Sequence, residues 1–85
     1  MTSWDDYWKT FYLLIDKLKQ EGQGQIVTEL KDAQRYVNGM TDGWFDFKMG
    51  MEKALELNKA KMTPDQVDIL KDLIEGLTDS LNRRE

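Results

Sequence analysis

The sequence contains no cysteine and no histidine. These absences exclude disulfides, thiol nucleophiles, and metal sites built from thiolates or imidazoles. They also remove the side chain that most often serves as a general base near neutral pH. A calcium loop starting at Asp42 would need glycine and glutamate where Phe47 and Lys53 stand. Because phosphate-binding loops and nucleophile elbows are also missing, we expect no enzymatic activity, no catalytic residue, no cofactor and no metal.

The sequence also lacks a long apolar run and a cluster of basic residues. The longest uninterrupted apolar stretch, residues 11–15, is far shorter than the roughly 20 residues of a membrane-spanning helix. The 16 acidic and 12 basic residues give a formal net charge of −4, which disfavours contact with nucleic-acid phosphates. Asp5 and Asp6 stand where a signal peptide would carry positive charge. We therefore expect a cytoplasmic protein with no membrane and no nucleic-acid partner.

Helical periodicity of apolar residues runs through the whole chain, and no useful stretch alternates as a strand would. The 85 residues suffice for a single helical domain, residues 1–85, with a small core. We predict an all-α, four-helix bundle-like fold with helices at residues 4–21, 25–38, 43–58 and 64–82. The short connections favour antiparallel neighbours.

Residue types typical of helix ends support the first three of these limits. Gly22 and Gly24 are expected to end the first helix, because glycine takes the left-handed conformation without a steric penalty. Gly39 is the expected stop of the second helix. Thr41 or Asp42 is the candidate N-cap of the third.

The clearest boundary signal lies in the second half of the chain. Thr63, Pro64 and Gln66 match a capping box with proline at the first helical position. Gly50 falls inside the predicted third helix, where glycine costs about 1 kcal/mol relative to alanine. That cost indicates either close approach of another backbone or a slight bend.

Eight of the nine aromatic residues fall into two short segments. The first comprises Trp4, Tyr7, Trp8, Phe11 and Tyr12, and the second comprises Trp44, Phe45 and Phe47. At about 100° per residue the first segment follows one core-facing stripe, with Tyr12 at its edge. In the second segment Trp44 and Phe47 share a core stripe, whereas Phe45 lies elsewhere together with Met49.

Three interpretations fit Phe45 and Met49. A central helix of a small bundle contacts neighbours on two sides, which would bury both side chains in the core. Alternatively, they line the seam of a homodimer, or they receive a partner protein, as exposed apolar patches commonly do. Methionine suits an adaptable surface because its side chain repacks easily.

Acidic residues recur at three- and four-residue steps along the fourth predicted helix. They are Asp65, Asp68, Asp72, Glu75 and Asp79. This spacing places them on one face, nearly opposite the apolar stripe. The face either keeps a small protein soluble or forms a docking surface for a basic partner, with Asp68, Asp72 and Glu75 at its centre.

The sequence therefore predicts a small acidic, non-enzymatic protein–protein interaction domain, such as an adaptor, a regulatory subunit, or an immunity or antitoxin protein. The alternative is a self-associating structural protein whose homodimer completes a helical core. The candidate partner-binding residues are Phe45, Met49, Asp68, Asp72 and Glu75.

Overall fold

The structure is a computed structural model that describes residues 4–37 and 41–82. It contains the α-helices α1 (Trp4–Gln20), α2 (Gly24–Gln34), α3 (Thr41–Asn58) and α4 (Pro64–Asn82). A short 3₁₀ turn, η1 (Lys59–Lys61), follows α3. The described residues contain no strand, so the all-α bundle prediction is confirmed.

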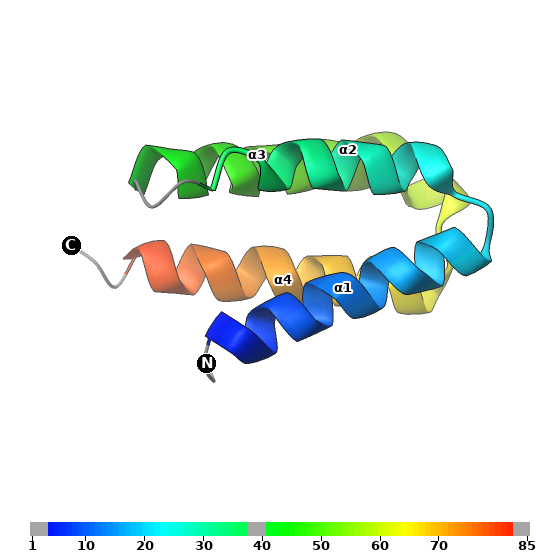
Figure 1. Ribbon diagram of the computed structural model, residues 1–85, viewed down its shortest axis with the longest axis horizontal. Coiled ribbons are helices and arrows are strands. Elements are labelled where there is room, and N and C mark those ends of the chain that lie inside the picture. Colours follow the sequence, from blue (N-terminus) through cyan, green and yellow to red (C-terminus); the bar gives the residue numbers. More distant parts are fainter. Residues whose placement is uncertain (1–3, 38–40, 83–85) are drawn as a thin grey trace.

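The four helices form an antiparallel bundle (Figure 1). Each helix contacts the next one along the chain, and α4 closes the ring by contacting α1. In Figure 1 α2 and α3 form the upper pair, and α1 and α4 form the lower pair. The expectation that short connections produce antiparallel neighbours is confirmed.

The predicted start of α4 is confirmed in atomic detail. The Thr63 amide donates to Gln66 Oε1 at 3.0 Å, and the Gln66 amide donates to Thr63 Oγ1 at 3.2 Å. These reciprocal bonds satisfy two amides that the helix itself leaves without partners. The same end of α4 is tied to α1 by an ion pair of 3.0 Å between Lys17 Nζ and Asp65 Oδ2.

The prediction that Gly22 ends α1 is confirmed, and the same prediction for Gly24 is wrong. Gly22 has a φ of +73°, and its amide donates to the Lys19 carbonyl at 3.1 Å. The Gln23 amide donates to the Leu18 carbonyl at 2.9 Å. This pair of bonds is the Schellman arrangement, which ends a helix within two residues. The chain then turns at once, so Gly24 becomes the first residue of α2.

The predicted limits of α2 and α3 need correction. α2 ends at Gln34 instead of residue 38, because its last amides change partners: Tyr36 and Val37 each donate to the carbonyl three residues earlier. Tightening of this kind is common at helix ends. The predicted stop at Gly39 lies outside the described residues. α3 already includes Thr41 and Asp42, so neither is its N-cap.

An aromatic stack joins α1 to α3 across the bundle. Trp4 and Trp44 stack with ring centroids 4.7 Å apart and planes 28° apart. The ring of Trp8 comes next, with its centroid 5.9 Å from that of Trp44 and its plane tilted by 31°. Phe47 follows Trp8 at a centroid distance of 5.6 Å and an interplanar angle of 30°. The order alternates between the two helices, so the two middle rings, Trp44 and Trp8, each lie between two rings of the other helix. Beyond the stack, Phe11, Leu14 and Leu18 are fully buried, which confirms the core stripe of α1.

Gly50 marks close contact between α2 and α3. A Cβ added at Gly50 would lie 2.5 Å from Ala33 Cβ and 3.4 Å from Ala33 Cα. No carbon side chain fits at that distance, so the absence of a side chain sets the spacing of the two helices. Of the two readings of Gly50, the close approach of another backbone is confirmed.

Replacing Gly50 with alanine is expected to destabilise the fold, although alanine is the better helix former by about 1 kcal/mol. Overpacking of this kind costs typically about 1–3 kcal/mol. Thermal and urea unfolding of G50A measure the loss. G24A is the matched control, because its Cβ would meet nothing within 4 Å. The double variant A33G/G50A should recover part of the loss. Equal stability of G50A and G24A would contradict the close contact.

The buried hydroxyl of Tyr7 should make the fold less stable at alkaline pH. Its hydroxyl donates a 2.8 Å hydrogen bond to the Leu73 carbonyl, and burial raises the pKa of Tyr7 well above its ordinary value. Above pH ~10 the phenol of the unfolded chain loses a proton that the folded chain keeps. Unfolding is then favoured as the pH rises.

We therefore expect the melting temperature to fall between about pH 9 and 11.5, and to fall less in Y7F. Circular dichroism measures both profiles. At pH 7, Y7F lacks only the hydrogen bond, which contributes about 0.5–1.5 kcal/mol. The same alkaline slope in both proteins would show that ionisation of Tyr7 is not involved.

Candidate functional site

Phe45 and Met49 lie on the outer surface of α3, and neither belongs to the core. Their side chains are 47% and 63% exposed. The interpretation that a second helix of the bundle covers them is therefore wrong. The reason is the rotation of α3 about its axis: Trp44 and Phe47 face the aromatic stack, and at 100° per residue this turns Phe45 and Met49 outward.

The two side chains begin a longer row along α3. Phe45, Met49, Lys53 and Leu57 follow at four-residue steps, and all four are exposed. Residues at this spacing form a raised row on a helix surface. We call these four residues the α3 ridge. Leu57 is 63% exposed, so apolar side chains stand at both ends of the ridge, with Lys53 between them.

A shallow groove of about 400 Å³ runs beside the ridge, between α2 and α3. Its lining includes the small residues Ala33, Gly50 and Ala54 and the charged residues Glu29, Asp32 and Lys53. Leu57 and Tyr36, which is 56% exposed, stand at its sides. We call it the α2–α3 groove. No pattern in the sequence pointed to Tyr36, which is the one aromatic residue outside the two segments. The α3 ridge, in contrast, could have been predicted from the sequence, because Met49, Lys53 and Leu57 follow one another at four-residue steps.

The acidic residues of α4 are where the spacing predicted. Asp68, Asp72 and Glu75 are all exposed on the face of α4 opposite its buried residues. Asp65 differs from them because it pairs with Lys17. No salt bridge in the described part of the chain involves Asp68, Asp72 or Glu75. The structure therefore leaves both interpretations of this face open.

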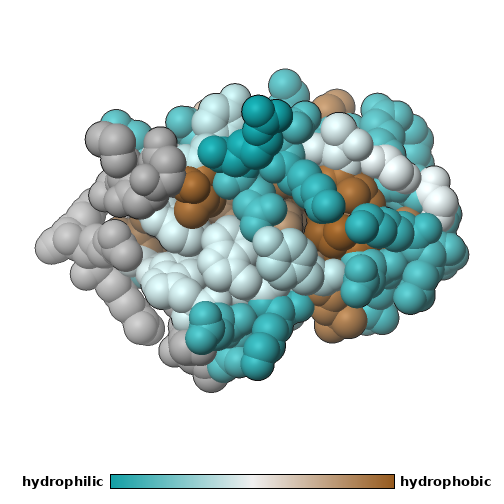
Figure 2. Space-filling view, viewed as in Figure 1, coloured by the Kyte–Doolittle hydropathy of each residue, from teal (hydrophilic) through white to brown (hydrophobic). Residues whose placement is uncertain are grey.

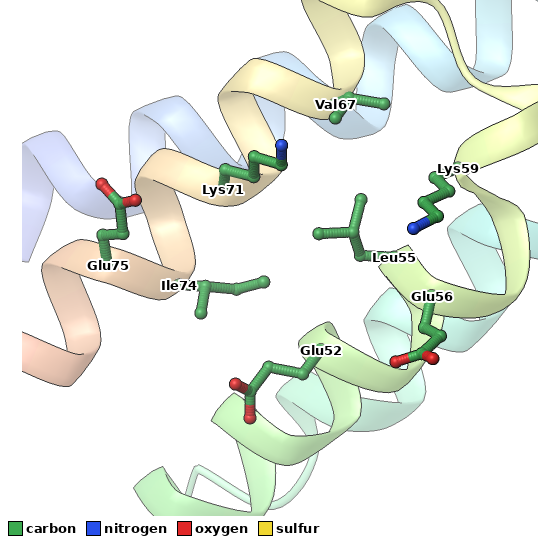
Figure 3. A pocket seen from close by; sticks show the side chains of 8 residues that line it. All are labelled: Glu52, Leu55, Glu56, Lys59, Val67, Lys71, Ile74 and Glu75. Carbon is green, nitrogen blue, oxygen red and sulfur yellow. The ribbon is translucent and has the colours of Figure 1, made fainter.

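Glu75 also lines a second groove, between α3 and α4, with a volume of about 480 Å³ (Figure 3). Its apolar floor is formed by Leu55, Val67 and Ile74. The charged side chains around it are of both signs: Glu52, Glu56, Glu75, Lys59 and Lys71. Phe45 and Met49 do not line this groove. The predicted apolar and acidic residues thus lie on neighbouring helices and do not form one site.

The face formed by α1 and α2 offers less to a partner. In Figure 2 hydrophilic side chains surround a pale band of intermediate hydropathy on this face, and hydrophobic side chains are visible in separate places. Tyr12 is 48% exposed, and its hydroxyl accepts a hydrogen bond of 2.9 Å from Gln34 Nε2. Leu13, 51% exposed, is the other large apolar residue exposed on α1. Neither belongs to a row like the α3 ridge.

Within residues 4–37 and 41–82, no group of three or more Asp or Glu side chains is arranged to hold a metal ion. No helix in these ranges is both long enough and apolar enough to cross a membrane.

Comparisons with protein-family models, with curated proteins and with solved structures found no match to this chain.

Proposed function

We propose that this chain is a non-enzymatic protein–protein interaction domain that binds through the α3 ridge. The observation that carries the proposal is the exposure of Phe45 and Met49 on successive turns of one helix. Single exposed apolar residues are ordinary on protein surfaces. Two on successive turns, with Leu57 farther along the same row, form a patch of the kind that marks interaction sites.

The composition of the ridge supports the same proposal. Aromatic residues and methionine are enriched in the buried parts of protein interfaces. A phenylalanine offers a large, rigid contact area, and a methionine adapts its shape to the partner. The small residues beneath the neighbouring α2–α3 groove leave space for a partner side chain next to the ridge.

Adaptor, regulatory, and immunity or antitoxin roles all fit such a domain. A cytoplasmic location and the absence of enzymatic activity stay predictions from the sequence.

The double substitution F45D/M49D should abolish partner binding and leave the fold intact, because both side chains are exposed. Affinity capture from extract of the native cells, with quantitative mass spectrometry, compares the variant with the wild type. Loss of two central interface side chains typically weakens binding by at least about 30-fold, or 2 kcal/mol. L13D is the matched control, because Leu13 is equally exposed on α1. The proposal fails if F45D/M49D retains every partner that the wild type captures.

A second test concerns the acidic face of α4. The free energy of unfolding of the triple variant D68N/D72N/E75Q should lie within about 0.5 kcal/mol of the wild-type value. Substitutions of exposed side chains away from caps, ion pairs and packed contacts have small effects on stability. If a basic partner docks there, the association rate falls and becomes less sensitive to salt. Stopped-flow measurements at 20 and 200 mM salt report both. The control D5N/D16N/E21Q removes the same charge from Asp5 and Asp16 of α1 and from Glu21, just beyond its end. Equal rates for both variants would leave this face a solvated surface only.

A further inference from the structure

We infer that a second copy of this chain packs antiparallel against the α3 ridge and forms a weak, two-fold symmetric dimer. The inference rests on the proposed function, because it names an occupant for the same surface. Three features of α3 carry it: the positions of the apolar side chains, the position of the α2–α3 groove, and the order of the charges along the helix.

The four residues of the ridge are placed evenly about Met51. Phe45 and Met49 lie on one side of this residue, and Lys53 and Leu57 lie at matching distances on the other. A two-fold axis at Met51 sets Phe45 of each copy opposite Leu57 of the second copy. It sets Met49 opposite the aliphatic chain of Lys53, which can cover apolar surface while its amine stays in water. Symmetric dimers require this kind of self-complementary surface.

The groove lies where the second copy needs it. The α2–α3 groove is lined by residues 50–57 of α3, whereas the protruding Phe45 and Met49 precede that range. The same two-fold axis carries the first half of α3 in one copy over the second half in the other. Phe45 of each copy therefore meets a groove of about 400 Å³ whose lining includes two alanines and a glycine.

The charges at the two ends of α3 also favour an antiparallel pair. Asp42 is exposed near its start, and Lys59 and Lys61 are exposed just beyond its end. The ion pairs within the described residues involve none of these three side chains. The two-fold axis at Met51 places Asp42 of each copy opposite residue 60, between the two lysines, whereas a parallel copy places like charges together, which is unfavourable. Asp46 falls opposite the exposed Glu56 and adds no such contact.

The size of the surface sets the strength of the dimer. The 18 residues of α3 are about 27 Å long, and the whole molecule measures 38 × 22 × 19 Å. A contact along one helix and its neighbouring groove therefore falls below the roughly 800 Å² per partner of a typical stable interface. Small interfaces of this kind are transient. We expect a dissociation constant between about 10 µM and 1 mM.

Sedimentation velocity and light scattering over a range from about 5 µM to 1 mM test the inference. The mass should rise from 10.0 kDa towards twice that value with concentration. F45D should stay monomeric, and L13D should behave as the wild type. A wild-type chain that is monomeric throughout overturns the inference, as does a dimer that F45D leaves unchanged. Neither result affects the proposed function, which fails only if F45D/M49D keeps its partners.

Charge reversal tests the orientation. D42K and K59E/K61E should each weaken association about tenfold or more, because each places like charges over one another. The combined variant D42K/K59E/K61E should regain association only in an antiparallel dimer, where the reversed ends face each other. If the combined variant is folded by circular dichroism but stays monomeric, the antiparallel arrangement is wrong.

A second measurement covers the case in which the combined variant does not fold. The chain has no cysteine, so K61C accepts a single spin label. The labelled chain is mixed with an unlabelled, ¹⁵N-enriched wild-type chain. An antiparallel dimer broadens the amide signals of Asp42 and Asp46 in the enriched copy. Broadening centred on residues 59–62 instead would overturn the proposal.

Discussion

The alternating stack of Trp4, Trp44, Trp8 and Phe47 is the interaction on which the rest of the structure depends. It joins α1 and α3, which lie diagonally across the bundle, and it fixes how α3 is rotated about its axis. Residues 44 and 47 can face the stack only if residues 45 and 49 face away from it. The core thus determines the surface: the rings that hold the bundle together also turn the α3 ridge outward.

A second constraint acts between α2 and α3. Gly50 and Ala33 let the two backbones approach more closely than larger side chains would allow. The same small residues leave the space above them unfilled, and this space is the α2–α3 groove. The small size of Gly50 and Ala33 therefore explains both the close contact of the two helices and the open groove above it. Asn58 stabilises the far end of this contact, because its side-chain amide donates to Glu29 of α2 at 3.0 Å and to the Ala54 carbonyl at 2.8 Å.

The fold was predictable wherever a local signal decided the outcome. The capping box at Thr63 predicted the first residue of α4, and Gly22 predicted where α1 ends. Both limits could be predicted because hydrogen bonds within a few residues determine them. The end of α2 was not predictable, since the helix tightens before the glycine that should have stopped it. Helical angle identified Phe45 and Met49 as a separate pair. It could not tell whether another helix covers them, because that depends on where α2 and α4 pack around α3.

The exposed ridge matters more in this protein than it would in a larger one. A chain of 85 residues buries only roughly 60–65% of the surface of its unfolded form, so each large apolar side chain left in water is a sizeable part of the burial still available. Phe45 and Met49 contribute nothing to the core, although Trp44 and Phe47 beside them contribute much of it. In the isolated bundle about half of Phe45 and more than half of Met49 stay in contact with water. These exposed apolar parts gain burial only when another protein surface covers them.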